Sequence, residues 1–432
     1  MVTLEHMGTD LPPSKTATRI RVDYALIGLF LVTSFLVETG LAREQDVLRN
    51  VFIATALLIG AMYVLFCALQ DARWTNVSLL VVPIPLLLYL ISFVLANSTT
   101  TTLTDNAFAI AAMVFSAIVS FFWIPQTFIR DKSRFFFALQ ILEFLALLAM
   151  AFAILGMLGV HSFLGFPLLA KDVYVQYGGF SAASGIMEHP LVFGMFMTMS
   201  AISTFYLYRV TRSYWHIVIC ILSCFFILLS QARGSVLAAA FAAAICFAPS
   251  FVISKRIVFI VCLLVLPGLA AVAYFVITLI PALSNFFRLN MGLSGREVIW
   301  GVGVFMILRN PWLGYGYGAA GKFTESISAT LLKLGFPVPG AAFHNTYLTY
   351  MFEEGVIAAI FYFLLYLIPL WAVSGAKIET TDKRHFLASI VSILLLNFWI
   401  DNNIGGLRIT SVVIGLHLGY GYLRARDLTR LS

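Results

Sequence analysis

Long apolar runs, separated by short polar breaks, repeat along the whole chain. A run of about 20 apolar residues is long enough for an α-helix to cross the hydrocarbon core of a bilayer. Because lipid offers the backbone no hydrogen-bond partner, each run is expected to form a helix that satisfies its own polar groups. The pattern predicts twelve membrane spans, near residues 22–41, 49–69, 78–96, 107–124, 135–158, 190–208, 216–231, 235–253, 257–280, 344–371, 386–400 and 404–423.

The composition agrees with this pattern. Of the 432 residues, 61% are hydrophobic and only 11% are charged; soluble domains have about 25% charged residues. This balance excludes a soluble enzyme and predicts an all-α polytopic membrane protein, in which residues 1–432 form one integral membrane domain. The five cysteines all lie inside apolar runs, where they are expected to be small buried side chains and not disulfides or metal ligands.

The net charge of +7 comes from basic residues in the connections between apolar runs. It therefore indicates orientation in the bilayer and not binding of nucleic acid. If the N-terminus is cytoplasmic, the inner segments hold 17 of the 27 Lys and Arg residues, and half of the other ten lie in the long loop 281–343, where the positive-inside rule does not apply. Both termini are therefore expected in the cytoplasm. Residues 1–21 lack the apolar core of a removable signal peptide, so the first span is expected to be the signal anchor.

Two outer connections, 159–189 and 281–343, are long, whereas the inner ones are short. We therefore expect the activity on the outer face. Residues 298–308 in the second loop are apolar but too few to span a bilayer, which favours an interfacial helix. Ser294 and Glu297 match a capping box at its start.

This expected helix ends at Asn310 and Pro311, and the glycine-rich residues 314–318 that follow are expected to form turns. The sequence has no H-E-x-x-H motif, no paired cysteines in the outer loops and no glycine-rich phosphate loop opening a helix. We therefore expect neither a catalytic metal nor a cofactor.

Several outer arginines are candidates for binding a phosphate, because a planar guanidinium matches two phosphate oxygens. Arg233 lies in the tight connection between the seventh and eighth spans; the alternatives are contact with lipid head groups or pairing with an acid such as Asp401. Arg296 lies in the first turn of the capped interfacial helix, where the helix dipole favours an anion. The remaining candidates for this positive basin are Arg288, Arg309, Lys322 and Arg408.

His344 lies at the outer end of the tenth span. A neutral imidazole there can act as a base or bind a phosphate, and the structural alternative is a single hydrogen bond at the membrane interface. Glu353 and Glu354 follow in the same run and can instead fix helix packing. On an unbroken helix, Gly355 and not Glu353 shares the face of His344. Glu188, just before the sixth span, can contact a polar substrate or simply precede a helix that begins at Pro190.

Glu143 is an acid inside the fifth apolar run. A buried acid in a membrane is a functional candidate, here a proton relay of a transporter. The alternative is that Gln140 or another helix of the bundle satisfies it.

Three blocks in this order resemble the O-antigen ligase and polysaccharide polymerase superfamily. Residues 230–235 (S-Q-A-R-G-S) are similar to its S-x-S-R-[GT] connection. Residues 295–318, with Arg296, Trp300 and P-W-L-G-Y-G-Y-G, look like its R-x-x-x-W and P-x-x-G-x-G block. Residues 344–355 (H-N-T-Y-L to E-E-G) are similar to its H-N-x-[YF]-L and E-x-G pattern. Ala232 and Glu354 depart from the usual residues of these blocks.

The resemblance implies a metal-independent, GT-C-like glycosyltransferase in the bacterial inner membrane, with its site on the periplasmic face. By the same implication, Arg233 and Arg296 bind a lipid diphosphate, and His344 activates the acceptor or stabilises the leaving group. Asn345, Glu353 and Glu188 are expected to support the site. The implied donor is a polyprenyl-diphosphate-linked glycan and the implied acceptor is a glycan or lipid A-core, with membrane lipids and other polysaccharide assembly proteins as further partners.

Three functions remain as alternatives. A polymerase joins lipid-linked repeat units into O-antigen or exopolysaccharide, and a ligase moves a finished chain to another lipid. The stretch 311–318 favours the polymerase. A glycolipid flippase or secondary transporter that uses Glu143 as a coupling site is the third, although the sequence shows no internal repeat of the kind that many transporters have.

Overall fold

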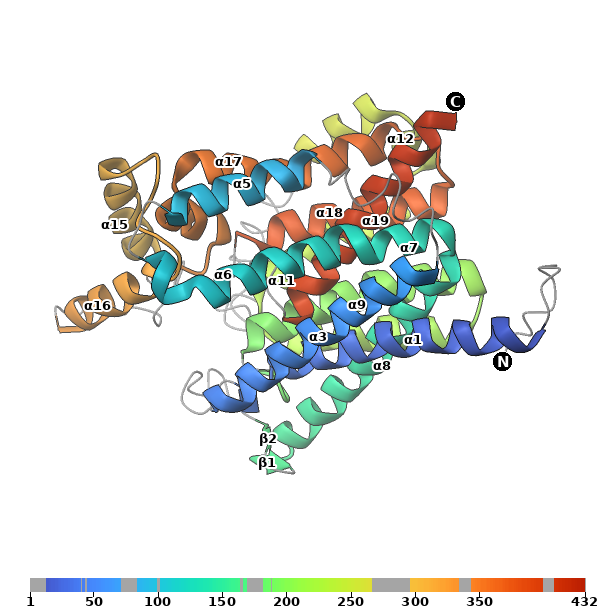
Figure 1. Ribbon diagram of the computed structural model, residues 1–432, viewed down its shortest axis with the longest axis horizontal. Helices are drawn as coiled ribbons and strands as arrows, with labels where there is room; N and C mark the ends of the chain where they lie inside the picture. The colour runs from blue at the N-terminus through green and yellow to red at the C-terminus, as the bar shows by residue number, and fades with distance from the viewer. Residues whose placement is uncertain are drawn as a thin grey trace, which may run out of the picture.

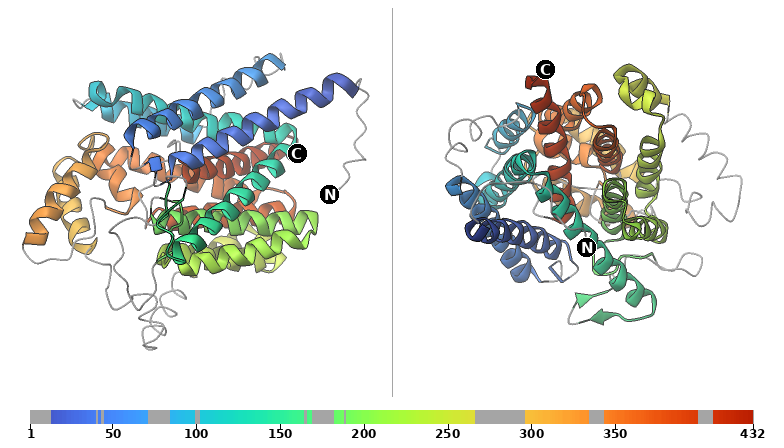
Figure 2. Two further views of the ribbon diagram at one scale, coloured as in Figure 1. Left: turned by 90° about the horizontal axis from the view of Figure 1, so that it is seen from below. Right: turned by 90° about the vertical axis from the view of Figure 1, so that its right-hand side faces the viewer.

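The computed structural model describes residues 13–39, 41–42, 45–70, 84–98, 102–163, 166–168, 182–187, 189–265, 296–333, 343–398 and 408–431. Most of these residues lie in helices that run side by side along one direction as a bundle, which the end-on view of Figure 2 shows. The helices of the N-terminal half are α1 (Pro13–Val37), α3 (Asp46–Gln70), α5 (Ile84–Ser98), α6 (Thr102–Ile118), the π-helix η1 (Val119–Trp123), α7 (Ile124–Arg130), α8 (Lys132–Met157) and α9 (Pro190–Thr211). Those of the C-terminal half are α10 (Tyr214–Leu229), α11 (Arg233–Phe247), α12 (Ser250–Ser254), α15 (Arg296–Arg309), α16 (Ala319–Lys333), α17 (Thr346–Gly375), α18 (Thr380–Leu396) and α19 (Ile409–Leu431).

This architecture confirms the predicted all-α polytopic membrane protein. Within the described residues, five helices are long and apolar enough to cross a membrane. They are Val47–Cys67, Ile110–Arg130, Lys132–Met157, Pro190–Thr211 and Thr346–Gly375. Shorter apolar helices, such as Tyr214–Leu229 and Arg233–Phe247, coincide with further predicted spans.

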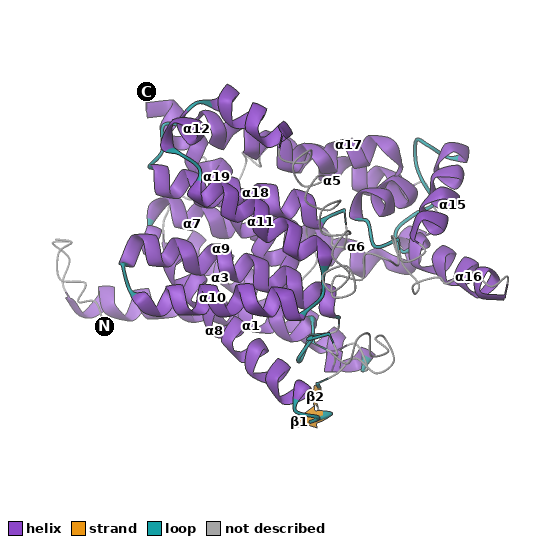
Figure 3. Ribbon diagram, turned by 180° about the vertical axis from the view of Figure 1, so that it is seen from behind, coloured by secondary structure: helices purple, strands orange, loops and turns teal. Residues whose placement is uncertain are grey.

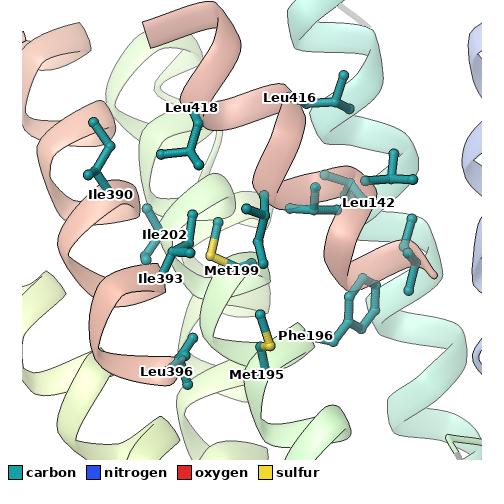
Figure 4. Packing of buried hydrophobic residues seen from close by; sticks show 14 of the residues in the cluster. Leu142, Met195, Phe196, Met199, Ile202, Ile390, Ile393, Leu396, Leu416 and Leu418 are labelled. Carbon is teal, nitrogen blue, oxygen red and sulfur yellow. The ribbon is translucent and has the colours of Figure 1, made fainter. Parts of the chain in front are cut away.

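The helix α9 lies at the centre of the bundle, and other helices surround it. In its most apolar stretch 83% of the residues are buried, compared with 22% in α3, which therefore faces outward. Figure 4 shows Met199 and Ile202 of α9 beside Ile393 of α18. Apolar side chains on all sides of a helix are typical of a helix enclosed by others.

A pair of glycines allows α19 to pack closely on the π-helix η1. A Cβ atom on Gly419 would lie 1.8 Å from the carbonyl oxygen of Phe121, and one on Gly415 would lie 2.5 Å from Oγ of Ser120. Small residues four apart let two membrane helices approach at backbone distance. This contact fixes the C-terminal helix α19 against η1.

The two ends of the bundle carry different elements. In Figure 1 the start of α1 and the end of α19 lie at one end, and α15 and α16 lie at the other. The expected interfacial helix is α15, whereas α16 was not expected; the proposed cap Ser294 lies outside the described residues. Two short strands, β1 (Ser162–Phe163) and β2 (Phe166–Pro167), form an antiparallel hairpin in the connection after α8, also unexpected (Figure 3).

Candidate active site

The turn that carries Arg233 is held by its own backbone and by Ser230. Arg233 is the first residue of α11, and the residue two positions before it, Gln231, adopts a left-handed conformation with φ 52°. The hydroxyl of Ser230 accepts a hydrogen bond from the N–H of Ala232 at 3.3 Å and donates one to the carbonyl of Ile227 at 2.7 Å. The turn therefore places the Arg233 side chain at the N-terminus of α11, where the helix dipole favours an anion.

This turn packs directly on the first turns of α9. A Cβ on Gly194 would lie 2.7 Å from Oγ of Ser230, 2.8 Å from Oγ of Ser235 and 2.9 Å from Cβ of Ala232. Small residues on both sides are therefore required at this contact. Ala232, which departs from the family pattern, is buried at this contact.

The contact at Gly194 brings Arg233 to the end of α9 that His189 caps. The Nδ1 atom of His189 accepts a hydrogen bond from the backbone N–H of Leu191 at 3.1 Å. Pro190 occupies the first helical position, where a missing N–H leaves no donor unsatisfied. His189 is thus an N-cap, a role that Asn, Asp, Ser and Thr usually fill.

His344 is fixed from both sides along the chain. Its backbone is left-handed, with φ 51°. On the C-terminal side, Asn345 caps α17, because its Oδ1 accepts the N–H of Leu348 at 3.1 Å. The N–H of Thr346 donates to the carbonyl of Asn397 at 2.8 Å, which joins the start of α17 to the end of α18.

On the N-terminal side, Trp300 of α15 determines where His344 lies. Its indole N–H donates a 2.7 Å hydrogen bond to the carbonyl of Phe343. Phe343 is buried against Gly303, where a Cβ would lie 2.6 Å from the ring. Arg296 and Trp300 are four residues apart on α15 and so share one face of that helix. The structure thus brings the arginine of the second sequence block to the segment that carries His344.

The rings of His189 and His344 lie against each other, with centroids 6.1 Å apart and planes inclined by 32°. One residue comes from the start of α9 and the other from the segment before α17. Because the Arg233 turn packs on α9 next to His189, these contacts bring Arg233, His189 and His344 to one end of the bundle.

The helix α17, which begins two residues after His344, is broken at Gly355, directly after Glu353 and Glu354. Gly355 has φ 83° and ψ 171°. The freed carbonyl of Phe352 accepts the N–H of Tyr315 at 2.9 Å, that of Glu353 accepts Gly316 at 2.7 Å, and the N–H of Val356 donates to Pro311 at 2.7 Å. The glycine-rich turn therefore satisfies the backbone at the break, and blocks two and three of the sequence form one structural unit.

Glu353 supports this unit. Its Oε1 accepts the backbone N–H of Ala320 at 3.1 Å, at the start of α16, and the side chain is only 6% exposed. A carboxylate at a helix N-terminus satisfies a free donor and interacts favourably with the helix dipole. Lys322, further along α16, is exposed.

Arg408 lies directly before α19, whose first turn is hydrogen-bonded to a buried acid, Glu38. Glu38 accepts the N–H of Thr410 at 3.0 Å and its hydroxyl at 2.6 Å. The next residue, Thr39, forms an isolated bridge with Met187, two positions before His189. Arg408 therefore belongs to the same end of the bundle as the histidine pair.

The glycine-rich turn also contacts the end of α5. Burial raises the pKa of Tyr317, the charge of Glu353 raises it further and the charge of Arg408 lowers it. The N–H of Tyr317 donates to Oδ1 of Asn97, at the end of α5, at 2.8 Å. Helices α9, α11, α17 and α19 thus begin at one end of the bundle, where their N-terminal dipoles together favour an anion.

Three residues of this end were not predicted from the sequence. His189 had no assigned role, although its position directly before Pro190 is a cap signal. Trp300 was part of a pattern without an assigned role, and Glu38 was not considered. Arg288 and Glu188 lie outside the described residues, as does Asp401. Among the described residues, no group of three or more His, Cys, Asp or Glu side chains could hold a metal ion.

Glu143 lies elsewhere, within the bundle. Its carboxylate is 2.8 Å and 3.0 Å from Nδ1 of His216, in the first turn of α10. The expectation that another helix satisfies Glu143 is confirmed.

Comparison with known proteins gives one family match. Residues 218–363 match a family model described as O-Antigen ligase. The matched stretch runs from α10 into α17 and includes Arg233, Arg296, Trp300 and His344, whereas His189 and Arg408 lie outside it. A search of curated proteins finds no match.

Proposed function

We propose that this chain, whose residues 218–363 match a family model described as O-Antigen ligase, polymerises polyprenyl-diphosphate-linked repeat units into O-antigen or exopolysaccharide at the periplasmic face. The single observation that carries this proposal is the gathering of Arg233, Arg296 and His344 at one end of the bundle, by the contacts at Gly194 and Trp300. A glycan on a lipid diphosphate presents two charged phosphates next to the reacting carbon. Fixed guanidinium groups and helix N-termini suit that anion.

The reaction is a displacement at the anomeric carbon. The bond between this carbon and the diphosphate oxygen breaks, and the bond to the acceptor hydroxyl oxygen forms. The acceptor proton passes to a base, and the polyprenyl diphosphate leaves with the electron pair. Donors already fixed where negative charge grows lower the barrier without moving at the moment of reaction.

In this proposal Arg233 and Arg296 bind the diphosphate, and Arg408, Lys322 and Arg288 extend the positive basin. His344 accepts the proton of the attacking hydroxyl, a contribution of about 10²- to 10⁴-fold to the rate. Asn345 supports it by capping α17, and Glu353 by capping α16. The transfer needs no metal in this scheme, because the leaving group is already charged.

Placement in the bacterial inner membrane, with both termini in the cytoplasm, belongs to the same proposal. Two observations support it. The start of α1 and the end of α19 lie at the end of the bundle opposite α15 and α16 (Figure 1). The basic residues of the inner connections and termini then lie at the cytoplasmic side. The donor and acceptor glycans, and any other assembly proteins, would reach the site from the opposite side.

The second candidate function is ligation of a finished glycan to lipid A-core. The description of the matched family model as O-Antigen ligase favours it. Both functions release the same polyprenyl diphosphate and use the same residues. A flippase that depends on Glu143 has less support, because that acid is buried and paired with His216.

The test is the glycan that accumulates on the lipid carrier when the gene is deleted. Single repeat units on the outer leaflet would support the polymerase. Long finished chains on the carrier would support the ligase instead. Units stranded on the inner leaflet would contradict both and favour the flippase.

A further inference from the structure

We infer that the end of the bundle opposite the candidate active site binds the head group of an anionic phospholipid, through Arg256 and Lys383 beside Trp371. This inference goes beyond the proposed function and is independent of it. Arg256 follows α12, which lies near the end of α19 in Figure 1, whereas α15 and α16 lie at the other end of the bundle. The residues of the candidate active site therefore take no part.

The first step of the argument is the position of the Arg256 guanidinium. Its Cζ atom lies 4.1 Å from the centre of the Trp371 ring, which is within the range of a cation–π interaction. Its Nη2 atom lies against Gly375, the last residue of α17, in the space that a Cβ atom would occupy. Arg256 is half-buried and Trp371 is exposed. The guanidinium therefore lies at the surface, between this ring and the end of α17.

The second step is that a further cation lies close to Arg256. The Nζ atom of Lys383 donates a 3.2 Å hydrogen bond to the carbonyl of Ala376, directly after α17, and the side chain is buried. Burial lowers the pKa of Lys383, and the positive charge of Arg256 lowers it further. The C-terminal end of a helix attracts a cation, but two cations in this position also repel each other.

The third step is that no acid of the described chain compensates this pair. Neither Arg256 nor Lys383 forms an ion pair with a described carboxylate, and the buried Nε–H of Arg256 has no hydrogen-bond acceptor there. Asp382 is next to Lys383 in the chain, but it pairs with Lys132 at 3.0 Å. Arg384 differs, because it donates to two carbonyls at the end of α11 at 2.9 Å and 2.8 Å. The unsatisfied donors of Arg256 and the positive charge together favour a bound anion.

The surroundings of Arg256 favour a lipid over a soluble anion. Trp371 lies near the end of α17, a helix long and apolar enough to cross a membrane, and tryptophan at such an end is typical of the head-group level. On the helix that begins at Arg256, the side chains of Ile257, Val261 and Leu264 are exposed. Their spacing of four and three residues places them on one face. A phosphate at Arg256 would have its acyl chains beside this apolar face.

Two substitutions test the site. Arg256→Gln removes the charge. Gly375→Ala keeps every charge, but its methyl group takes the place of Nη2 and displaces the guanidinium. Because that atom is the end of a flexible side chain, the fold should tolerate Gly375→Ala. The matched control is Arg212→Gln, an exposed arginine directly after α9 at the same end of the bundle.

The probe is dioleoylphosphatidylglycerol, titrated into the full-length protein in detergent while the midpoint of thermal unfolding is recorded. The reference is dioleoylphosphatidylcholine, which has the same chains and no net charge. A ligand that binds only the folded state raises the midpoint as its concentration rises. We expect the anionic lipid to raise the wild-type midpoint more than the reference does. Arg256→Gln and Gly375→Ala should each need about 10-fold more anionic lipid for the same rise, the loss of one hydrogen bond to a charged group, and Arg212→Gln should match the wild type.

Equal effects of the two lipids on the wild type would overturn the inference. An equal loss in Arg212→Gln would also overturn it, because it would indicate general attraction to a basic surface. An unchanged response in Gly375→Ala would show that the position of the guanidinium beside Gly375 is not needed, which removes the site. If glycerol 3-phosphate, the head group without chains, raised the midpoint as much as the lipid at the same concentration, the occupant would be a soluble anion and the inference would fail. Should Arg256→Gln not fold, Gly375→Ala decides alone.

Discussion

The indole of Trp300 donates a 2.7 Å hydrogen bond to the carbonyl of Phe343, the residue directly before His344. Trp300→Phe keeps a smaller aromatic ring but removes the hydrogen-bond donor. We expect it to destabilise the fold by only about 1 kcal/mol, the usual contribution of one hydrogen bond, while the transfer rate falls about tenfold because His344 is less well positioned. Trp312→Phe, an exposed tryptophan, is the control. A transfer assay measures the rate and thermal unfolding measures the stability of both variants. An unchanged transfer rate in Trp300→Phe would contradict the prediction.

Gly355→Ala should be severely destabilising. Its Cβ would lie 2.1 Å from the carbonyl oxygen of Trp312, and its φ of 83° is strained for any residue with a side chain. The break in α17 and the turn at 311–316 would no longer fit together. Expression and the midpoint of thermal unfolding measure this, with Gly321→Ala as control because nothing lies within 4 Å of its added Cβ. Equal midpoints for the two variants would refute the prediction.

Two substitutions of Glu353 distinguish a structural role of this side chain from a role in the reaction. Glu353→Gln keeps an oxygen that can accept the N–H of Ala320, so both stability and transfer should remain close to the wild type. Glu353→Ala removes the cap of α16 and should lower the free energy of unfolding by about 0.5–2 kcal/mol. If Gln abolished transfer in a stably folded protein, the negative charge of Glu353 would be needed for the reaction.

Arg233→Lys should lose most transfer activity although it keeps the charge. An ammonium cannot donate two parallel hydrogen bonds to one phosphate. The expected loss is about 10-fold or more, equivalent to at least one charge-assisted hydrogen bond. Arg212→Lys, at the opposite end of α9, is the matched control. Wild-type transfer by a folded Arg233→Lys protein would show that charge alone suffices.

Substitution of Glu143 distinguishes glycan transfer from glycolipid transport as the function of the protein. Glu143→Gln retains a hydrogen-bonding group for His216 but cannot carry a proton as a carboxylate does. We expect transfer to continue in Glu143→Gln and to be lost in His344→Ala. A transporter coupled through Glu143 would give the opposite pattern, measured as movement of a labelled glycolipid between leaflets of proteoliposomes.

The sequence by itself determined the class of the protein and the positions of its helices. Hydropathy is a local property, so the apolar runs located α8 and α9 to within a few residues. The capping preferences of single residues were local as well, and they explain why helices start at Pro190 and near His344. The three sequence blocks also identified Arg233, Arg296 and His344 as the residues to examine.

Only the tertiary structure decided which of these residues meet. Arg233 approaches the histidines because Gly194 lets the α10–α11 turn pack on α9, and a glycine in an apolar run does not specify its neighbour. The break at Gly355 looked like part of a continuous helix, because the donors that satisfy its free carbonyls come from the distant residues Tyr315 and Gly316. Contacts of this kind depend on shape and on hydrogen bonds between segments far apart in the chain, which no local pattern encodes.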